Sequence, residues 1–365
     1  MIPITKVVFG PEHERQVLEV LKSGQIAQGS KVAEFEELCA NMAGTRSAIA
    51  VNNGTTALVL ALRSLGIGEG DEVITSPFTF AATLNAILEV GATARFGDID
   101  QSYNLDPNTV EPLITERTKA IMPVHLYGLP AQMNHFQEIS TRNEISLIED
   151  AAQAHFAITA DGKPAGSYGL GCFSFYATKN LTSGEGGVVT VNDPELEESM
   201  RILRNQGMKQ RYQYEVPGYN FRMTDLAAAV AIPQFTHAEE MVSIRQQNAS
   251  KLSNGLKEIR GLVVPEPSNN VSHVWHQYTV RLNEESEKTR DDLATVLQEE
   301  NIGFGFYYPR AVYDYECYRN HPRVLIEDSP NAEEFAANVI SLPVHPHLSD
   351  SDIDRIVSVL QTTLS

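Results

Sequence analysis

The chain has 365 residues, of which 42% are hydrophobic and 21% are charged, and its formal net charge is −19. This length exceeds what one hydrophobic core usually organises, so we expect two domains, or one large domain with a smaller appendage. The acidic charge repels nucleic-acid phosphates and anionic membranes, and no Lys/Arg cluster offsets it, so we expect neither as a partner. No apolar run approaches the roughly 20 residues that span a bilayer, and the first residues lack a signal-peptide pattern. We therefore expect a cytoplasmic protein.

Cysteine and histidine spacing gives no sign of a metal site. The three cysteines are odd in number and widely spaced, which favours free thiols. The nearest approach to a metal-binding pattern is two histidine pairs, His273/His276 and His345/His347. Neither pair has a third ligand close in sequence, and zinc needs at least three protein ligands, so we expect no metal.

Two helices are expected at the N-terminal end. Residues 11–24 follow a helical pattern, with proline at the start and glycine just past the end. A second helix is expected to begin after Ser30, whose hydroxyl can cap its first turn, and to stop at Gly44.

Short apolar runs then alternate with helix-like segments such as 55–65 and 79–90. Seven runs have the length and composition of strands: 47–51, 72–75, 93–96, 120–124, 146–149, 172–176 and 187–191. Strands separated by helices favour a parallel sheet covered on both faces. We therefore expect an α/β fold, with a large domain built on a mostly parallel seven-stranded sheet.

The pattern changes beyond about residue 240. A helical stretch from Thr224 to about Gly261 precedes a strand-like run at 275–282 and helix-like segments at 287–300 and 350–360. This order is typical of a small α+β unit. We expect a large domain at residues 1–240, N-terminal helices included, and a small C-terminal α+β domain at residues 241–365.

Ligands of open parallel sheets lie beyond the carboxyl ends of the strands, so polar residues at those ends are the first candidates. The first group is Asn53-Gly54-Thr55, where a strand runs into a helix. Glycine allows close backbone approach, and the free N–H groups of a helix start attract an anion such as phosphate. An ordinary tight turn with a threonine cap would give the same pattern.

The second group follows the run at 146–149, which ends in Glu149-Asp150 and leads to Gln153. A carboxylate in an apolar wall is costly unless it meets a cation or several donors, and a protonated pyridine nitrogen is such a cation. Alternatively, Asp150 caps the turn that follows.

The third group contains Lys179, which follows a strand-like stretch carrying Ser174 and precedes a glycine-rich turn at 184–187. Burial lowers the pKa of an amine and makes it a nucleophile, so such a lysine suits covalent attachment of a ligand. Most lysines are simply solvated, and that alternative applies to Lys179 taken alone.

Taken together, these segments closely resemble the DegT/StrS family of pyridoxal-phosphate nucleotide-sugar aminotransferases, within the aspartate-aminotransferase fold class (fold type I). The resemblance covers nearly the whole chain. Its motifs are SGQIAQGSKVAEFE, NNGTTAL, GDEVITSPFTFAAT, IEDAAQAH, FSFYATKNLTSGEGG, GYNFRMTDLAAA and SLPVHPHLSDSDI. The large domain would accordingly bind pyridoxal 5′-phosphate.

The resemblance implies a role for each matching residue. Lys179 would carry the cofactor covalently and shuttle a proton, Asp150 would pair with the pyridinium nitrogen, and Gln153 would lie near the phenolic oxygen. An aromatic ring stacks on the cofactor in this family, and Phe80 occupies its place. The remaining cofactor contacts would go to the phosphate: Gly54, Thr55, Ser174 and, from the neighbouring subunit of a homodimer with shared active sites, Asn220.

The resemblance also implies an activity. L-glutamate would give its amino group to the C3 or C4 keto group of a nucleotide-linked sugar, for amino sugars of a polysaccharide or a glycosylated metabolite. The substrate contacts would come from Gly24, Ile26, Arg222, Tyr307 and Tyr308. Tyr307 replaces the usual histidine of a His-Tyr pair, and Ile26 stands where some relatives have an aromatic residue, so the sugar is not fixed by these motifs.

Three other readings compete with this one. A dehydratase of the same fold carries histidine in place of the Schiff-base lysine, and Lys179 argues against it. A regulatory protein that lost activity would not need Lys179, Asp150 and Gln153 together. An aminotransferase acting on a cyclitol ketone stays open as the alternative substrate class.

Overall fold

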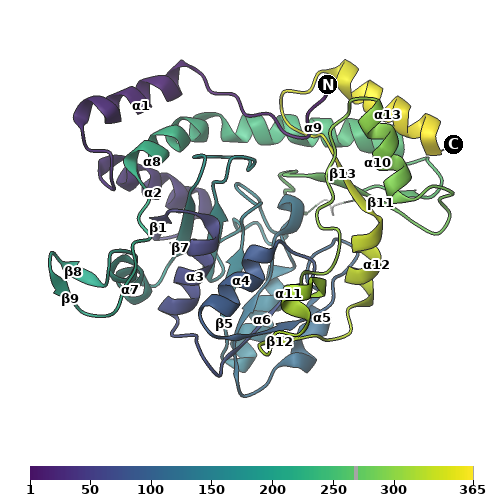
Figure 1. Ribbon diagram of the computed structural model, residues 1–365. Helices are drawn as coiled ribbons and strands as arrows, with labels where there is room; N and C mark the ends of the chain where they lie inside the picture. The colour runs from purple at the N-terminus through teal and green to yellow at the C-terminus, as the bar shows by residue number, and fades with distance from the viewer. Residues whose placement is uncertain (267–269, 365) are drawn as a thin grey trace.

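The computed structural model of the chain describes residues 1–266 and 270–364. Its largest element is an eight-stranded sheet in the order β1-β7-β6-β5-β4-β2-β3-β12, seen in the lower part of Figure 1. In that order the strands are β1 (Ser47–Val51), β7 (Gly187–Val191), β6 (Leu170–Ser174), β5 (Ser146–Asp150), β4 (Thr118–Met122), β2 (Glu72–Thr75), β3 (Thr93–Phe96) and β12 (Val324–Leu325). Neighbours are parallel except at β7, which is antiparallel to β1 and β6. The predicted α/β fold class is confirmed.

All seven expected strands are present, but the sheet has one strand more than predicted. The extra strand, β12, contributes only Val324 and Leu325, which pair with Ala94 and Arg95 of β3. A strand of two residues has no periodic pattern to detect, and its position depends on a partner more than 220 residues earlier in the chain.

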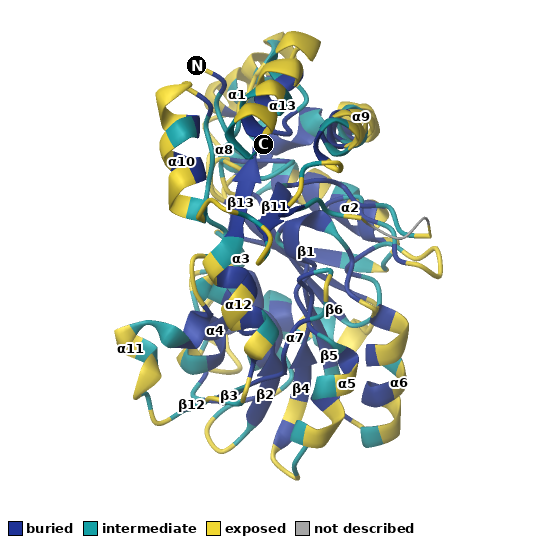
Figure 2. Cartoon of the chain, turned by 90° about the vertical axis from the view of Figure 1, so that its right-hand side faces the viewer, coloured by how far each residue is buried: buried dark blue, intermediate teal, exposed yellow. Residues whose placement is uncertain are grey.

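Helices cover both faces of this sheet. The connections contain α3 (Gly54–Ser64), α4 (Ala81–Glu89), α5 (Pro107–Val110), α6 (Met133–Asn143) and α7 (Pro194–Arg204), with short turns η1 (Glu111–Leu113) and η2 (Leu126–Gly128). Side chains alternate along β1: Ile49 and Val51 join the core that contains α3 and α4. Ala48 and Ala50 join the core that contains helix α2 (Ser30–Ala43). Figure 2 shows the resulting pattern, with buried strands between helices whose outer faces are exposed.

The two N-terminal helices form where expected, but the cap of the second differs. Helix α1 (Pro11–Ser23) ends at Gly24, whose φ of 71° is the left-handed conformation that glycine adopts freely. Ser30 is the first residue of α2 and does not cap it. Oδ1 of Asp225 instead accepts hydrogen bonds from the backbone N–H groups of Gly29 (2.8 Å) and Val32 (2.9 Å). The expected Ser30 cap is therefore wrong, because a distant carboxylate takes its place.

The C-terminal part is built on a long helix, which runs across the upper part of Figure 1, and a small antiparallel sheet at the right. Helix α8 (Asp225–Ala231) continues through η3 (Ile232–His237) into α9 (Ala238–Leu256). The sheet has the order β10-β11-β13. Its strands and the later helices are β10 (Leu262–Val263), β11 (Tyr278–Leu282), β13 (Val339–Leu342), α10 (Arg290–Glu299), α11 (Glu316–Arg319), α12 (Pro330–Asn338) and α13 (Asp350–Leu364), with η4 (Val312–Asp314). The boundary at residues 240/241 falls at the start of α9 and stays a prediction.

Two further segments complete the fold. The first residues of the chain lie against the C-terminal part, where Ile2 N–H donates to the carbonyl of Asn301 (2.9 Å). The hairpin β8 (Met208–Gln210) and β9 (Gln213–Tyr214) projects from the body next to α7 (Figure 1). Within the described ranges, no helix combines the length and apolarity needed to cross a membrane.

Candidate active site

A cavity of about 970 Å³ lies at the carboxyl ends of the central strands. Strand β5 ends in Asp150 and β6 ends in Ser174, so both side chains arrive at the same edge of the sheet. The residues predicted from the sequence that line this cavity are Gly54, Thr55, Phe80, Asp150, Gln153, Ser174, Lys179, Tyr307 and Tyr308.

Lys179 reaches the cavity from the turn that follows β6. Its backbone N–H donates to the carbonyl of Tyr176 (2.9 Å), which fixes the turn. Burial lowers the pKa of the Lys179 amine to about 8, and the negative charge of Asp150 opposes that shift. A substantial share of this amine is therefore neutral, and nucleophilic, at mildly alkaline pH.

Asp150 is 5% exposed and faces the same cavity. Burial raises the pKa of its carboxyl group, whereas hydrogen bonds from Thr83 and Ala152 and the charge of Lys179 lower it. Thr83 Oγ1 donates to Oδ2 (2.8 Å) and the backbone N–H of Ala152 donates to Oδ1 (3.2 Å). The site thus holds a carboxylate with two donors in a largely dry wall, as a partner for a cation requires.

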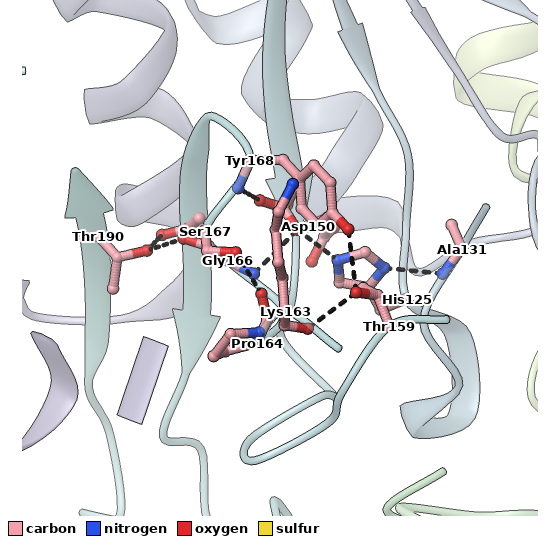
Figure 3. Close-up of polar contacts among 12 residues, drawn as sticks. His125, Ala131, Asp150, Thr159, Lys163, Pro164, Gly166, Ser167, Tyr168 and Thr190 are labelled. Atoms are coloured by element: carbon pink, nitrogen blue, oxygen red, sulfur yellow. Dashed lines mark hydrogen bonds and ion pairs between the residues drawn. The ribbon is translucent and has the colours of Figure 1, made fainter. Parts of the chain in front are cut away.

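The backbone of Asp150 is held by hydrogen bonds at both its N–H and its carbonyl group. Asp150 N–H donates to the carbonyl of Pro123 (2.9 Å), and its own carbonyl accepts from His125 N–H (3.0 Å). The preceding residue, Glu149, is fully buried and contacts His125 Nε2 (2.9 Å). Glu149 also accepts from the backbone N–H groups of Gly166 and Tyr168 (2.8 Å each). Figure 3 shows part of this network: Ala131 N–H donates to the other ring nitrogen of His125. The strand end that carries Asp150 is therefore held in one position.

Gln153 and two aromatic side chains form another part of the wall. Gln153 Oε1 accepts from Tyr127 N–H (2.7 Å), and its Nε2 donates to the hydroxyl of Tyr308 (3.2 Å). The ring of Tyr308 lies 5.9 Å from that of Phe80, which is 59% exposed. Burial raises the pKa of Tyr308, so its hydroxyl stays protonated and can donate. Phe80 leaves an aromatic face open to a flat ligand.

The start of α3 forms the end of the cavity that is best suited to an anion. Asn53 caps this helix by accepting a hydrogen bond from Thr56 N–H (2.8 Å). A Cβ atom on Gly54 would lie 2.6 Å from Cβ of Ser174, so only glycine lets the helix start approach β6 this closely. The remaining free N–H groups and the positive helix end favour a phosphate here.

Four of the predicted site residues lie away from the large cavity of their own chain. Gly24, Ile26, Asn220 and Arg222 are absent from the described lining of the cavity. Arg222 Nη1 donates to Oδ1 of Asn205 (2.7 Å) and lines a different cavity of about 570 Å³. Asn220 pairs with Asn205 through the backbone.

Sequence reasoning missed three residues of the site. Thr83, which holds Asp150, belongs to the first turns of α4, and only the folded chain brings it to β5. Arg245 and His276 line the cavity from the C-terminal part. A single arginine within a helix carries no motif, and His276 stood out only as a weak metal candidate. In the described residues no group of three or more possible ligands is placed to hold a metal ion.

A mainly parallel sheet that presents a lysine, a buried carboxylate and an anion-binding helix start to one cavity defines the class of protein. The residues fit pyridoxal phosphate, since the amine can bind its aldehyde, the carboxylate its ring nitrogen and the helix start its phosphate. This is a pyridoxal-phosphate-dependent aminotransferase. The chain belongs to the DegT/DnrJ/EryC1/StrS aminotransferase family, whose model matches residues 9–361.

Individual relatives match this chain over nearly their whole length. The chain is 38% identical over 349 residues to UDP-N-acetyl-3-dehydro-alpha-D-glucosamine 3-aminotransferase of Acidithiobacillus ferrooxidans, which covers 95% of this chain and 92% of the relative. It is 38% identical over 354 residues to GDP-perosamine synthase of Caulobacter vibrioides, covering 95% and 94%. The crystal structure of S. venezuelae DesV superposes with a TM-score of 0.91 at 37% identity, covering 96% of this chain and 94% of DesV.

Proposed function

We propose that this protein transfers an amino group from L-glutamate to the C3 or C4 keto group of a nucleotide-linked sugar, as a step in amino-sugar biosynthesis. The observation that carries the proposal is the cavity that Lys179 and Asp150 line together, in a chain whose relatives are named for UDP- and GDP-linked sugars.

The proposed chemistry divides between the cofactor and the chain. When bound, pyridoxal phosphate supplies an aldehyde that captures amines and a ring that withdraws electrons from the reacting carbon. Lys179 would hold the cofactor through Nζ and, once released, use the same atom to take a proton from the substrate carbon and return it. Its pKa of about 8 suits both tasks, because a general base works best when its pKa lies near the working pH. The Asp150 carboxylate would stay ionised and face the ring nitrogen.

The other cofactor contacts follow from the shape of the cavity. Gly54, Thr55 and Ser174 lie where the start of α3 meets the end of β6, which supports a phosphate site there. The open face of Phe80 supports stacking on the cofactor ring. Hydrogen bonds to Tyr127 and Tyr308 hold the Gln153 amide in a fixed orientation in the cavity wall. This orientation supports a role for Gln153 near the phenolic oxygen of the cofactor, beside the Tyr308 hydroxyl.

We also propose a homodimer with shared active sites. Asn220 and Arg222 lie outside the described lining of their own chain's cavity, which supports their serving the twin's site instead. A two-fold interface is self-complementary and would form two equivalent sites. Arg222 would meet the sugar nucleotide in the twin's site, whose lining includes that chain's own Tyr307 and Tyr308. Gly24 and Ile26 would also contact the substrate.

The nucleotide and the position of amination need direct measurement, because relatives of equal identity are named for different nucleotides. The test is a screen of 3-keto and 4-keto sugars linked to UDP, GDP and dTDP, with L-glutamate as donor and products identified by mass spectrometry. We expect one nucleotide-linked keto-sugar to gain an amino group. Amination of a cyclitol ketone alone, or of none of these ketones, would show that the proposed substrate class is wrong.

A further inference from the structure

Gln153 and Tyr308 meet in the wall of the large cavity, which has a volume of about 970 Å³. Gln153 Nε2 lies 3.2 Å from the hydroxyl oxygen of Tyr308. Oε1 of the same amide accepts a hydrogen bond from the backbone N–H of Tyr127 (2.7 Å), so the amide cannot turn over without losing that bond. The amide nitrogen therefore faces Tyr308, and Gln153 is the donor of the pair.

The direction of this hydrogen bond leaves the proton of Tyr308 available. A phenol oxygen that accepts a hydrogen bond still has its own O–H to donate. Among the described residues, no acceptor takes this proton, and the second N–H of the Gln153 amide has no acceptor there either. Burial raises the pKa of Tyr308, and the negative charge of Asp150 raises it further, so the hydroxyl stays protonated at neutral pH. The cavity wall thus offers two adjacent donors.

Two fixed donors of this kind suit an anionic oxygen, which accepts both hydrogen bonds at once and needs to donate none. The phenolic oxygen of pyridoxal phosphate is such a group. It stands on the ring between the nitrogen and the carbon that bears the aldehyde, on the side away from the phosphate arm. With Asp150 proposed at the nitrogen and Lys179 at the aldehyde, the groups that hold this oxygen should lie beside both.

The surroundings of Tyr308 agree with that position. The charge of Asp150 acts on the pKa of Tyr308, so the hydroxyl lies near this carboxylate. The ring of Tyr308 lies 5.9 Å from that of Phe80, which is proposed to stack on the cofactor. Tyr308 therefore borders the space that the cofactor ring would fill.

We propose that Tyr308 is a cofactor-binding residue, whose hydroxyl donates to the phenolic oxygen of pyridoxal phosphate together with the free N–H of Gln153. The family resemblance implies Gln153 for this oxygen and places Tyr308 at the substrate, so the proposal adds a role for Tyr308. It rests on the proposed cofactor contacts of Asp150 and Phe80. Two donors would stabilise the ionised form of the phenolic oxygen and keep the cofactor ring in one orientation.

The neighbouring Tyr307 provides a matched control. It lines the same cavity, but its hydroxyl makes no hydrogen bond to Gln153 in the described part of the chain. Its backbone carbonyl accepts from the hydroxyl of Tyr127, a contact that a change of side chain keeps. Tyr307→Phe and Tyr308→Phe therefore remove the same group from the same wall, and only the second removes the proposed donor.

The first test measures binding without turnover. Pyridoxamine 5′-phosphate and its analogue without the phenolic oxygen are titrated into cofactor-free wild type, Tyr308→Phe and Tyr307→Phe by calorimetry. Both ligands carry an amine in place of the aldehyde, so neither joins Lys179 covalently. Loss of the oxygen should weaken binding about tenfold more in wild type than in Tyr308→Phe, because only wild type has the donor to lose.

Two comparisons make this result specific. The analogue without the oxygen should bind wild type and Tyr308→Phe within about twofold, which shows that the variant keeps the site intact. Tyr307→Phe should behave as wild type with both ligands. An equal loss in all three proteins would overturn the proposal.

The second test follows the absorbance of the bound cofactor against pH in the loaded protein. The donor favours the ionised cofactor, so its absorbance change should move about one pH unit or more upwards in Tyr308→Phe. Tyr307→Phe should titrate as wild type. A Tyr308→Phe curve that overlays wild type, with only the KM for the keto-sugar raised, would contradict the proposal and leave Tyr308 a substrate contact.

These tests are separate from that of the proposed function, because neither uses a keto-sugar or L-glutamate. If no keto-sugar is aminated but loss of the phenolic oxygen matters less in Tyr308→Phe, the role of Tyr308 stands and the proposed substrate is wrong. If nucleotide sugars are aminated and the oxygen matters equally in both proteins, the proposed function stands and the role of Tyr308 is wrong.

Discussion

Thr83 Oγ1 donates a hydrogen bond to Oδ2 of Asp150 across 2.8 Å, and Thr79 Oγ1 lies 2.8 Å from the same threonine hydroxyl. All three side chains are buried. Burial raises the pKa of Asp150, and the Thr83 hydrogen bond is the largest influence that lowers it. Thr83 therefore favours the ionised carboxylate on which the proposed chemistry depends.

Replacing Thr83 by valine keeps the shape of the side chain and removes this donor. The pKa of Asp150 should rise, so protonation would inactivate the enzyme from a higher pH downwards. A hydrogen bond to a charged group is worth about 1.5–3 kcal/mol, so kcat should fall about tenfold to a hundredfold at neutral pH and further below it. The measurement is kcat against pH, with Thr83→Ser as the control that keeps the hydroxyl. A Thr83→Val profile that overlays wild type would refute this role.

Asp150→Asn should keep some cofactor and lose most of the activity. The amide has nearly the same shape, but it cannot stabilise a positive charge on the ring nitrogen. Losing an oriented charge partner costs several kcal/mol at the transition state, and each 1.36 kcal/mol is a factor of about ten in rate. Single-turnover rates of the half-reaction with L-glutamate measure the chemical step directly. Rates within about tenfold of wild type would mean that Asp150 has another role.

The lowered pKa of Lys179 predicts how cofactor uptake depends on pH. Only the neutral amine attacks an aldehyde, and with a pKa of about 8 roughly a tenth of it is neutral at pH 7. The rate at which the cofactor-free protein takes up pyridoxal phosphate should therefore rise with pH and level off above about pH 9. Stopped-flow absorbance gives this profile. A rate that keeps rising towards pH 10.5, the ordinary value for lysine, would show that the amine is not perturbed.

Much of the fold and part of the site could be predicted from the sequence, because these features depend on residues that are neighbours in the chain. The strand runs and the residues that end them, Asp150 and Ser174, are contiguous features, so their pattern places them at the sheet edge before any contact is known. The contacts that complete the site are not local. Asp225 caps α2 across 196 positions, Thr83 meets Asp150 across 67, and Arg245 enters from the C-terminal part. Such pairings depend on tertiary packing, which hydrophobic periodicity does not encode.

Shared active sites predict that two defective chains can restore each other. Co-expression of a Lys179→Ala chain with an Asn220→Ala/Arg222→Ala chain would give heterodimers in which one site carries every defect and the other carries none. Activity should return to about half of the wild-type value per dimer, although both parent homodimers are impaired.

The controls are the two parent homodimers, each purified with the same affinity tags as the heterodimer. Heterodimers no more active than the parents would contradict the shared site. An active monomer by light scattering would do the same. In that case Arg222 would have only its local contact with Asn205.

The most direct test of the account is to find which lysine holds the cofactor. The protein is loaded with pyridoxal phosphate, reduced with borohydride, digested and mapped by mass spectrometry, and Lys179→Ala is treated in parallel. We expect the label on Lys179 and none on the variant. Lys163 is the natural comparison, because it is exposed and its amine lies 3.1 Å from Asp161. Cofactor found on Lys163 or on any other lysine of the wild-type protein, with Lys179 unlabelled, would contradict the assignment.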